Sequence, residues 1–198
     1  MFHQAASFNQ RGFKVSKIDD AYTLYKKHIY DEEKIGLLKK YNLKIAGSVP
    51  SVLWELFGAM LTGRVGQGTT GADLHGWEVK SAKAGGSYEY QYHLNTGAEK
   101  LAEDCSVNHL FCSYSETYKD VTVRAIKGQK LAASFFNAWM PEYGRNYDAS
   151  VPASQRRQRF RKNISLGYVE THGKLILRIA NGVLKERYDA YLDEFNEE

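Results

Sequence analysis

Hydrophobic residues recur three or four positions apart over the first part of the chain, which is the spacing of a helix with one buried face. This pattern predicts a helix over 17–30. Asp31 is a favourable N-cap followed by two glutamates, and it predicts a second helix over 31–41. Ser48 is another N-cap candidate, and the broad apolar face that follows it predicts a third helix ending at Gly63.

The period of the pattern changes beyond this helix. The segment 63–71 holds four glycines and two threonines, which indicates a loop. After it, apolar and polar residues alternate, as they do in strands with one buried face. The pair His75–Gly76 predicts a tight turn between the first two strands. We expect strands over 73–74, 77–83, 87–94, 107–115, 121–126, 164–169 and 174–180, and helices over 96–104, 129–140 and 183–195.

This order of elements predicts a single domain of the mixed α/β (α+β) class, with a central mixed sheet of about five strands flanked by helices. A chain of 198 residues is long enough for one sizeable core. We distinguish an N-terminal helical region (1–47), a core region (48–126) and a C-terminal region (127–198) that holds a helix, a basic segment and the closing strands and helix.

Composition excludes several classes of protein. Hydrophobic residues make up 43% and charged residues 25%, as in a folded soluble domain. The sequence lacks a run of about 18 apolar residues and the pattern of a signal peptide, so we expect no membrane-spanning segment. Cys105 and Cys112 have neither metal-ligand spacing nor the pattern of a disulfide framework, so we expect a cytoplasmic protein with reduced thiols. The net charge of +4 permits nucleic-acid binding without requiring it.

The side chains that indicate a chemistry lie between Gly71 and Lys80. Alternation sends Glu78 and Lys80 to one face of a strand, and a short hairpin brings Asp73 alongside Glu78. Two carboxylates can hold a hard divalent cation, and a neighbouring lysine can position water and stabilise negative charge. This set suits the hydrolysis of a phosphodiester. The simpler interpretation is a surface hairpin with a weak ion pair.

A further carboxylate stands upstream in the third predicted helix. Glu55 lies within the apolar run 52–57, so its burial is plausible, and a buried carboxylate needs a partner such as a metal ion or a lysine. The alternative places Glu55 on the polar side of the helix. Glu89, in the strand predicted over 87–94, is a rival acid.

These residues resemble the PD-(D/E)xK motif of type II restriction endonucleases and their mismatch-repair nicking relatives, over 48–123. The resemblance implies catalysis by Asp73, Glu78 and Lys80, with Mg²⁺ as the cofactor. It further implies that Glu55 supplies an additional catalytic carboxylate and metal ligand beside Asp73 and Glu78. Ala72 stands where the motif has proline, and only four residues separate the two acids of the motif.

A second signal is basic. Five cations occur within 155–163, and no acid occurs over 149–169. Such a run can neutralise phosphates, and arginine can read guanine edges, although a solvated loop or helix face is the usual interpretation of a charge run. A glycine-rich loop over 64–70 can approach a phosphate closely. The expected DNA contacts are Arg156, Arg157, Arg159, Arg161 and Lys162 in the basic run, Arg64 and Gln67 in the loop, and Lys83, Gln91 and His93 near the predicted catalytic strand.

The sequence therefore predicts a site-specific endonuclease for double-stranded DNA that acts as a homodimer on a palindrome. The helices predicted over 131–139 and 183–195 are candidate dimer surfaces, though both can instead cover the sheet. Three alternatives stay open: a nicking or repair nuclease with the same centre, a non-catalytic DNA-binding protein, and a small-molecule hydrolase that uses Asp73 and Glu78 as an acid/base pair.

Overall fold

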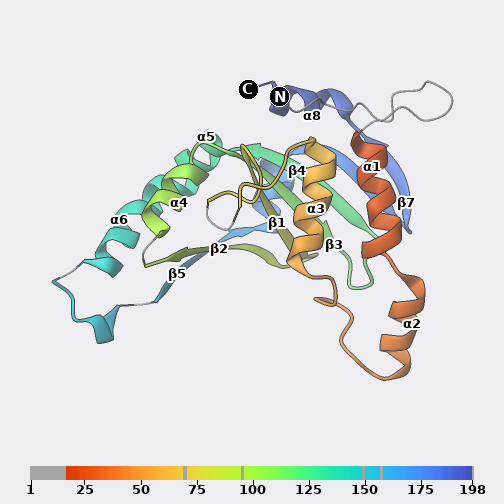
Figure 1. Cartoon of the computed structure of the whole chain (residues 1–198), viewed down its shortest axis with the longest axis horizontal. Coiled ribbons are helices and arrows are strands. Elements are labelled where there is room, and N and C mark those ends of the chain that lie inside the picture. The colour runs from red at the N-terminus through yellow and green to blue at the C-terminus, as the bar shows by residue number, and fades with distance from the viewer. Residues whose placement is uncertain (1–16, 69–70, 95, 149, 157, 198) are drawn as a thin grey trace.

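The fold was analysed in a computed structural model, which describes residues 17–68, 71–94, 96–148, 150–156 and 158–197 (Figure 1). The helices are α1 Lys17–Leu24, α2 Glu32–Lys40, α3 Ser51–Thr62, α4 Gly97–Asp104, α5 Gly128–Leu131, α6 Asn137–Tyr147, α7 Leu166–His172 and α8 Asp189–Asn196. The strands are β1 Trp77–Lys83, β2 Ser87–His93, β3 Asn108–Tyr114, β4 Val121–Lys127, β5 Arg159–Ser165, β6 Lys174–Ala180 and β7 Val183–Arg187. Two π-helical segments, Tyr25–Ile29 and Ala132–Phe136, continue α1 and join α5 to α6.

The main sheet has five strands in the order β1-β3-β4-β6-β7. Strands β1 and β3 are parallel, with Glu78 opposite His109, and the remaining pairs are antiparallel. The prediction of a mixed α/β fold with a central mixed sheet of five strands and flanking helices is confirmed. Strand β1 lies at one edge of this sheet, so one side of its backbone is not paired with another strand of the sheet.

Strands β2 and β5 form a separate antiparallel ribbon. The chain leaves β1 through a glycine turn in which Gly86 N donates to Lys83 O and Gly85 adopts a φ of +82°. Only glycine takes this backbone conformation without strain. The turn releases β2 from the plane of the main sheet, and β2 pairs instead with a strand about 70 residues further along the chain.

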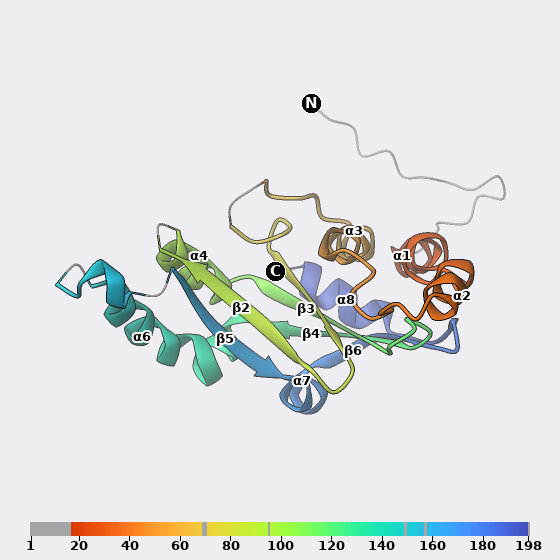
Figure 2. The ribbon, with the colours of Figure 1, turned by 90° about the horizontal axis from the view of Figure 1, so that it is seen from below.

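Two hydrophobic clusters fill the two faces of the main sheet. Val79 and Leu110 belong to a cluster shared with α1, α3 and α8, whereas Phe111 belongs to a cluster shared with the β2–β5 ribbon, α5, α6 and α7. Figure 2 shows α1 and α3 on one side of the main sheet and α7 on the other. The strands are therefore covered on both faces, and alternate residues of β1 point to different layers.

Helix α3 approaches β1 closely because Gly58 faces the strand. A Cβ at this position would lie 2.7 Å from Val79 Cγ2 and 3.4 Å from Leu110 Cδ2. Glu55 is one turn earlier on the same helix, so the close approach also brings this carboxylate toward β1.

Several predicted boundaries are confirmed and others are wrong. Asp31 caps α2 by accepting from Lys34 N at 2.9 Å, and Gly63 ends α3 with a φ of +70°. Ser48 does not cap α3. Pro50 restricts the residue before it to an extended conformation, and the helix begins only at Ser51.

Two predicted elements in the C-terminal region are also wrong. The strand expected over 164–169 ends at Ser165, whose hydroxyl accepts from Tyr168 N at 3.2 Å and caps helix α7. The helix expected over 183–195 is strand β7 followed by α8, because Asn181 and Gly182 adopt positive φ and return the chain alongside β6. Across the residues that the structure describes, no helix has the length and apolar character needed to cross a membrane.

Candidate active site

A two-residue turn places Asp73 beside β1. Leu74 N donates to Trp77 O at 2.9 Å and Trp77 N donates to Leu74 O at 3.0 Å, so the chain reverses over His75–Gly76 as expected. The strand expected over 73–74 is absent, and Leu74 alone forms isolated bridges, to Gly66 and Trp77. Asp73 Oδ2 accepts from the backbone N–H of Val79 at 2.8 Å. The short spacing in the sequence is thus accommodated by a very tight reversal.

Glu78 and Lys80 lie on one face of β1, as the alternation predicts. Lys80 Nζ is 2.5 Å from Glu78 Oε1, and Glu78 is only 2% exposed. Asp73 N donates to Glu78 Oε2 at 3.3 Å. The ammonium group of Lys80 lies 4.8 Å from the centre of the Tyr90 ring, a cation–π distance. The structure therefore brings together Asp73, Glu78 and Lys80.

Helix α4 adds a second lysine that the sequence analysis missed. Lys100 Nζ donates to Glu78 Oε2 at 2.8 Å and also to Asp104, one turn further along α4. Tyr92 donates its hydroxyl to the other oxygen of Asp104 at 2.9 Å. A Lys and an Asp one turn apart resemble an ordinary surface ion pair in sequence, so the available signal was weak.

The buried histidine next to this charged cluster, His109, is neutral. His109 is fully buried, and burial lowers its pKa to about 4. Its Nε2 lies 2.8 Å from Asp104 O, which can only accept, so Nε2 carries the proton. The hydroxyl of Tyr90 then donates to Nδ1 at 2.9 Å. His109 is thus a packed histidine with both ring nitrogens hydrogen-bonded.

The two acids on β1 and the adjoining turn differ in their electrostatic surroundings. Burial, and then the charge of Glu78, raises the pKa of Asp73 to about 6, although Lys80 and the Val79 N–H oppose the shift. Burial also acts to raise the pKa of Glu78, but the charges of Lys80 and Lys100 outweigh it and hold that pKa below its usual range. The negative charge of Glu55 adds to the raised pKa of Asp73. The charge of Glu78 is therefore compensated by two lysines, whereas that of Asp73 is compensated only in part, by Lys80 and the Val79 N–H.

This donor set bears on the predicted Mg²⁺ site. The described side chains contain no group of three or more His, Cys, Asp or Glu residues arranged to hold a metal ion. Mg²⁺ commonly takes one or two carboxylates and completes its shell with water and phosphate oxygens. Asp73 and Glu78 supply two carboxylates, but each oxygen of Glu78 already contacts a lysine. Asp73 has a raised pKa, and an added cation would stabilise its ionised form.

A pocket of about 590 Å³ adjoins this cluster. It is lined by Gln67, Gly71, Gln91, His93, Thr96, Glu99, Lys100 and Glu103. Gln67 reaches across it, and its amide donates to Glu103 Oε1 at 2.9 Å. Lys100 both lines the pocket and contacts Glu78, so the pocket opens beside the buried carboxylate. Three of the expected DNA contacts, Gln67, Gln91 and His93, therefore lie near the candidate site.

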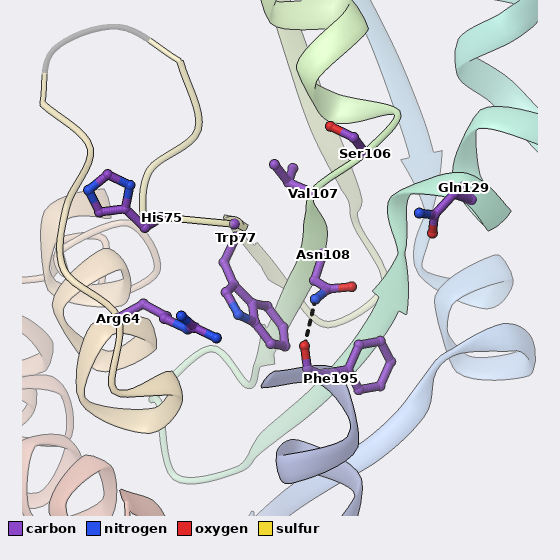
Figure 3. A pocket seen from close by; sticks show the side chains of 9 residues that line it. Arg64, His75, Trp77, Ser106, Val107, Asn108, Gln129 and Phe195 are labelled. Atoms are coloured by element: carbon purple, nitrogen blue, oxygen red, sulfur yellow. Dashed lines mark hydrogen bonds between the residues drawn. The ribbon is translucent and has the colours of Figure 1, made fainter. Parts of the chain in front are cut away.

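Other predicted contacts lie elsewhere. Arg64 donates to Asn196 O at 2.7 Å and lines a different pocket of about 460 Å³, at the start of β1 and β3 (Figure 3). In that pocket Asn108 donates to Phe195 O, which ties β3 to α8. Lys83 stands at the far end of β1 and pairs with Glu116 at 2.9 Å.

Only the second part of the basic run, from Arg159 onward, lies in strand β5, whereas Arg156 precedes the strand. Arg159 and Arg161 are exposed. Lys162 turns to the other face, where its ammonium pairs with Glu142 at 2.6 Å. Arg156 is half-buried and donates to Val151 O at 2.6 Å, and Arg157 lies outside the described residues.

The rival acid and the candidate dimer helices can also be placed. Glu89 lies on the exposed face of β2, opposite to the buried face that carries Tyr90, so it is turned away from Glu78. Within 131–139 the residues Leu131, Phe136 and Trp139 are buried in the second hydrophobic cluster, so the main apolar face of this helix covers the sheet. No protein-family model matches the chain, and a search of curated proteins finds no matching sequence.

Proposed function

We propose that this protein is a magnesium-dependent endonuclease that hydrolyses phosphodiester bonds in double-stranded DNA. The observation that carries the proposal is the convergence of Asp73, Glu78 and Lys80 at the edge strand β1, beside a pocket. The carboxylates of Asp73 and Glu78 are both more than half buried. Asp73 accepts from the backbone N–H of Val79, and Glu78 accepts from the backbone N–H of Asp73. Buried charges in this density require a functional or structural partner.

The charge balance of the cluster supports a cationic cofactor and an anionic substrate. Asp73, Glu78 and Asp104 face two ammonium groups, those of Lys80 and Lys100, so ionisation of all three acids leaves an excess of negative charge. Bound Mg²⁺ would supply positive charge that neutralises the phosphate and polarises its bonds. Asp73 and Glu78 are the residues that would hold it.

The lysines have different roles in this proposal. Lys80, half-buried and paired with Glu78 Oε1, would orient the attacking water and stabilise the charge that develops on the phosphate. Burial acts to lower the pKa of Lys100, but the charges of Glu78 and Asp104 outweigh burial and hold that pKa above its usual range. Lys100 therefore stays protonated and keeps Glu78 ionised for metal binding.

The finer part of the proposal is a type II restriction enzyme, in which two copies related by a two-fold axis each cut one strand of a palindrome. A monomer that nicks one strand at a time is the alternative for the same centre. Sedimentation with a short duplex distinguishes the two, because a dimer gives a complex of two chains per duplex. In a cleavage time course, the dimer should give double-strand breaks without a nicked intermediate.

The decisive experiment incubates supercoiled plasmid with the protein in Mg²⁺ or in EDTA. Discrete fragments that require Mg²⁺ support the restriction enzyme, and nicked circles support a nicking enzyme. Asp73→Asn, Glu78→Gln and Lys80→Ala should each abolish cleavage. The control is Lys174→Ala, which removes a lysine of another strand from its surface pair with Glu194 and should leave cleavage unchanged.

Binding is measured in parallel with Ca²⁺ in place of Mg²⁺. The three site variants should retain DNA binding, because they act on the scissile phosphate rather than on affinity. Binding without any cleavage by the parent protein indicates a non-catalytic DNA-binding protein. Untouched plasmid and no binding contradict the proposal and favour small-molecule chemistry at the same carboxylates.

A further inference from the structure

The β2–β5 ribbon has one apolar and one polar face. The buried residues of its inner face, Tyr88, Tyr90, Tyr92, Phe160 and Ile164, pack in the second hydrophobic cluster. The outer face is formed by Ser87, Glu89, Gln91, His93, Arg159, Arg161, Asn163 and Ser165. All of these outer residues are polar, and only Gln91 among them is partly buried. A ribbon with such a face exposes an array of hydrogen-bonding groups on a rigid support.

The inner face fixes the ribbon relative to the candidate active site. Tyr90 packs under the ammonium of Lys80, and Tyr92 donates to Asp104. On the outer side, Gln91 and His93 line the pocket that also holds Lys100. The outer face therefore begins beside this pocket and extends away from it along the paired strands β2 and β5, which lie side by side in Figure 2.

The dimensions of the ribbon suit a DNA groove. The major groove of B-DNA admits a two-stranded β-ribbon. Alternate residues of a strand are about 6.8 Å apart, which equals about two base-pair steps. Gln91 stands opposite Arg161, and His93 stands opposite Arg159, so successive rows of the outer face can address different base pairs.

The chemistry of the outer face matches the edges of base pairs. Arginine pairs with guanine, and asparagine or glutamine with adenine, each through two hydrogen bonds. Arg161 Nη1 is 3.7 Å from Glu89, and Arg159 Nη1 is 3.5 Å from Gln91 Oε1. These contacts are long and solvent-exposed, so a base edge can replace them at little cost. The arginines also complement the negative charge of DNA.

We propose that the outer face of the β2–β5 ribbon is the surface that reads DNA sequence, by entering the major groove next to the cleaved phosphate. This inference rests on the proposed function. It assigns base contacts to Arg159, Arg161, Gln91 and Asn163. It assigns no base contact to Lys162, whose ammonium pairs with Glu142 on the other face.

The test uses a pool of duplexes with a randomised central segment, bound in Ca²⁺ and sequenced after selection. The parent protein should enrich one sequence. Arg161→Ala should relax the preference at a single base pair and weaken binding to the enriched duplex by about 5- to 150-fold. Arg161→Lys keeps the charge but not the paired geometry, so it should lose the preference and keep binding to a scrambled duplex.

The matched control is Arg178→Ala. Arg178 has the same exposed side-chain fraction as Arg161, 51%, and likewise pairs with a glutamate on the neighbouring strand, but it lies on β6 of the main sheet. This control should keep both affinity and preference. Urea unfolding of each variant shows that the fold is retained.

The outcomes separate this inference from the function on which it rests. Unchanged preference in the Arg159, Arg161, Gln91 and Asn163 variants overturns the reading surface, while Mg²⁺-dependent cleavage by the parent still supports the nuclease. An equal loss of affinity for every duplex, with a dependence of log affinity on log salt that is less steep by about one, assigns phosphate contacts to these residues. This outcome also overturns base reading. No duplex binding and no cleavage by the parent contradicts the proposed function itself.

Discussion

Replacing Asp73 by Asn should make the metal-free protein more stable at neutral pH while abolishing cleavage. The carboxylate of Asp73 is largely buried next to Glu78, and burial together with that neighbouring charge raises its pKa to about 6. At neutral pH Asp73 is ionised in both states, and the ionised form costs more free energy in the folded protein than in the unfolded chain. An amide removes the charge and can still accept the hydrogen bond from Val79 N–H.

The magnitude follows from the pKa. The ordinary value is 3.8 and the value for Asp73 is about 6. Since a pKa difference of one between the folded and unfolded states corresponds to about 1.4 kcal/mol, ionised Asp73 lowers the free energy of unfolding by up to about 3 kcal/mol. We expect Asp73→Asn to gain about 1–3 kcal/mol at about pH 8, and each kcal/mol raises Tm by about 2–4 °C in a chain of this size.

The sign of the pH dependence is also determined. Between the two pKa values the folded protein retains a proton at Asp73 that the unfolded chain has lost. The contribution of this group to stability therefore falls as the pH rises through that window, and the full penalty is present above about pH 6. The gain of the Asn variant over the parent should be small near pH 4 and complete near pH 8.

The assay is urea unfolding of parent and variant in EDTA across this pH range. Asp193→Asn, on the exposed side of α8, is the control for loss of an aspartate charge and should not change the free energy of unfolding. Added Mg²⁺ should stabilise the parent more than the Asn variant, because Asp73 is a proposed ligand. A variant less stable than the parent near pH 8, or a difference independent of pH, refutes the reasoning.

Three further predictions concern the same edge of the sheet. Glu78→Gln should lower the free energy of unfolding, measured in urea, by about 3 kcal/mol, because Lys80 and Lys100 lose their shared counter-charge. This change is opposite in sign to that of Asp73→Asn, and equal stability of variant and parent contradicts it. Mg²⁺ affinity, measured by calorimetric titration, should increase as the pH rises through about 6, since Asp73 must lose its proton, and a flat profile argues against Asp73 as a ligand. Gly58→Ala should destabilise the protein by about 1–3 kcal/mol and reduce cleavage, because the added methyl group would lie 2.7 Å from Val79 Cγ2 and displace α3. Gly36→Ala is the control, since the added atom there meets open space.

The parts of the site that are local in sequence could be predicted. Strand alternation places Glu78 and Lys80 on one face whatever the strand pairs with, and a turn of His75 and Gly76 suffices to return Asp73. Lys100 and Asp104 could not be assigned in the same way. Their role depends on how α4 is oriented against β1 and β2, which is a tertiary property that neither residue type nor spacing reveals.

The same distinction explains the errors in the fold. The predicted strand over 164–169 is displaced relative to β5 because the partner strand β2 is distant in the sequence. In addition, a single capping serine, Ser165, determines where the strand ends and helix α7 begins. In the closing segment, the five residues of β7 contain too little pattern to distinguish strand alternation from helical spacing, so the sequence wrongly predicts one helix there. The Asn181–Gly182 pair was the local signal for a hairpin.

The position of the site at a sheet edge has a physical basis. An edge strand exposes backbone groups that favour pairing with other chains, and proteins commonly cover or charge such edges. In β1 the N–H of Val79 is taken by Asp73, and the neighbouring Glu78 and Lys80 place charge along the same strand. The carboxylate that blocks the edge is thereby held against the backbone with its charge only partly compensated. The arrangement that protects the sheet from further strand pairing also preorganises a carboxylate oxygen beside a pocket. The proposed function uses this oxygen to hold a cation next to a phosphate.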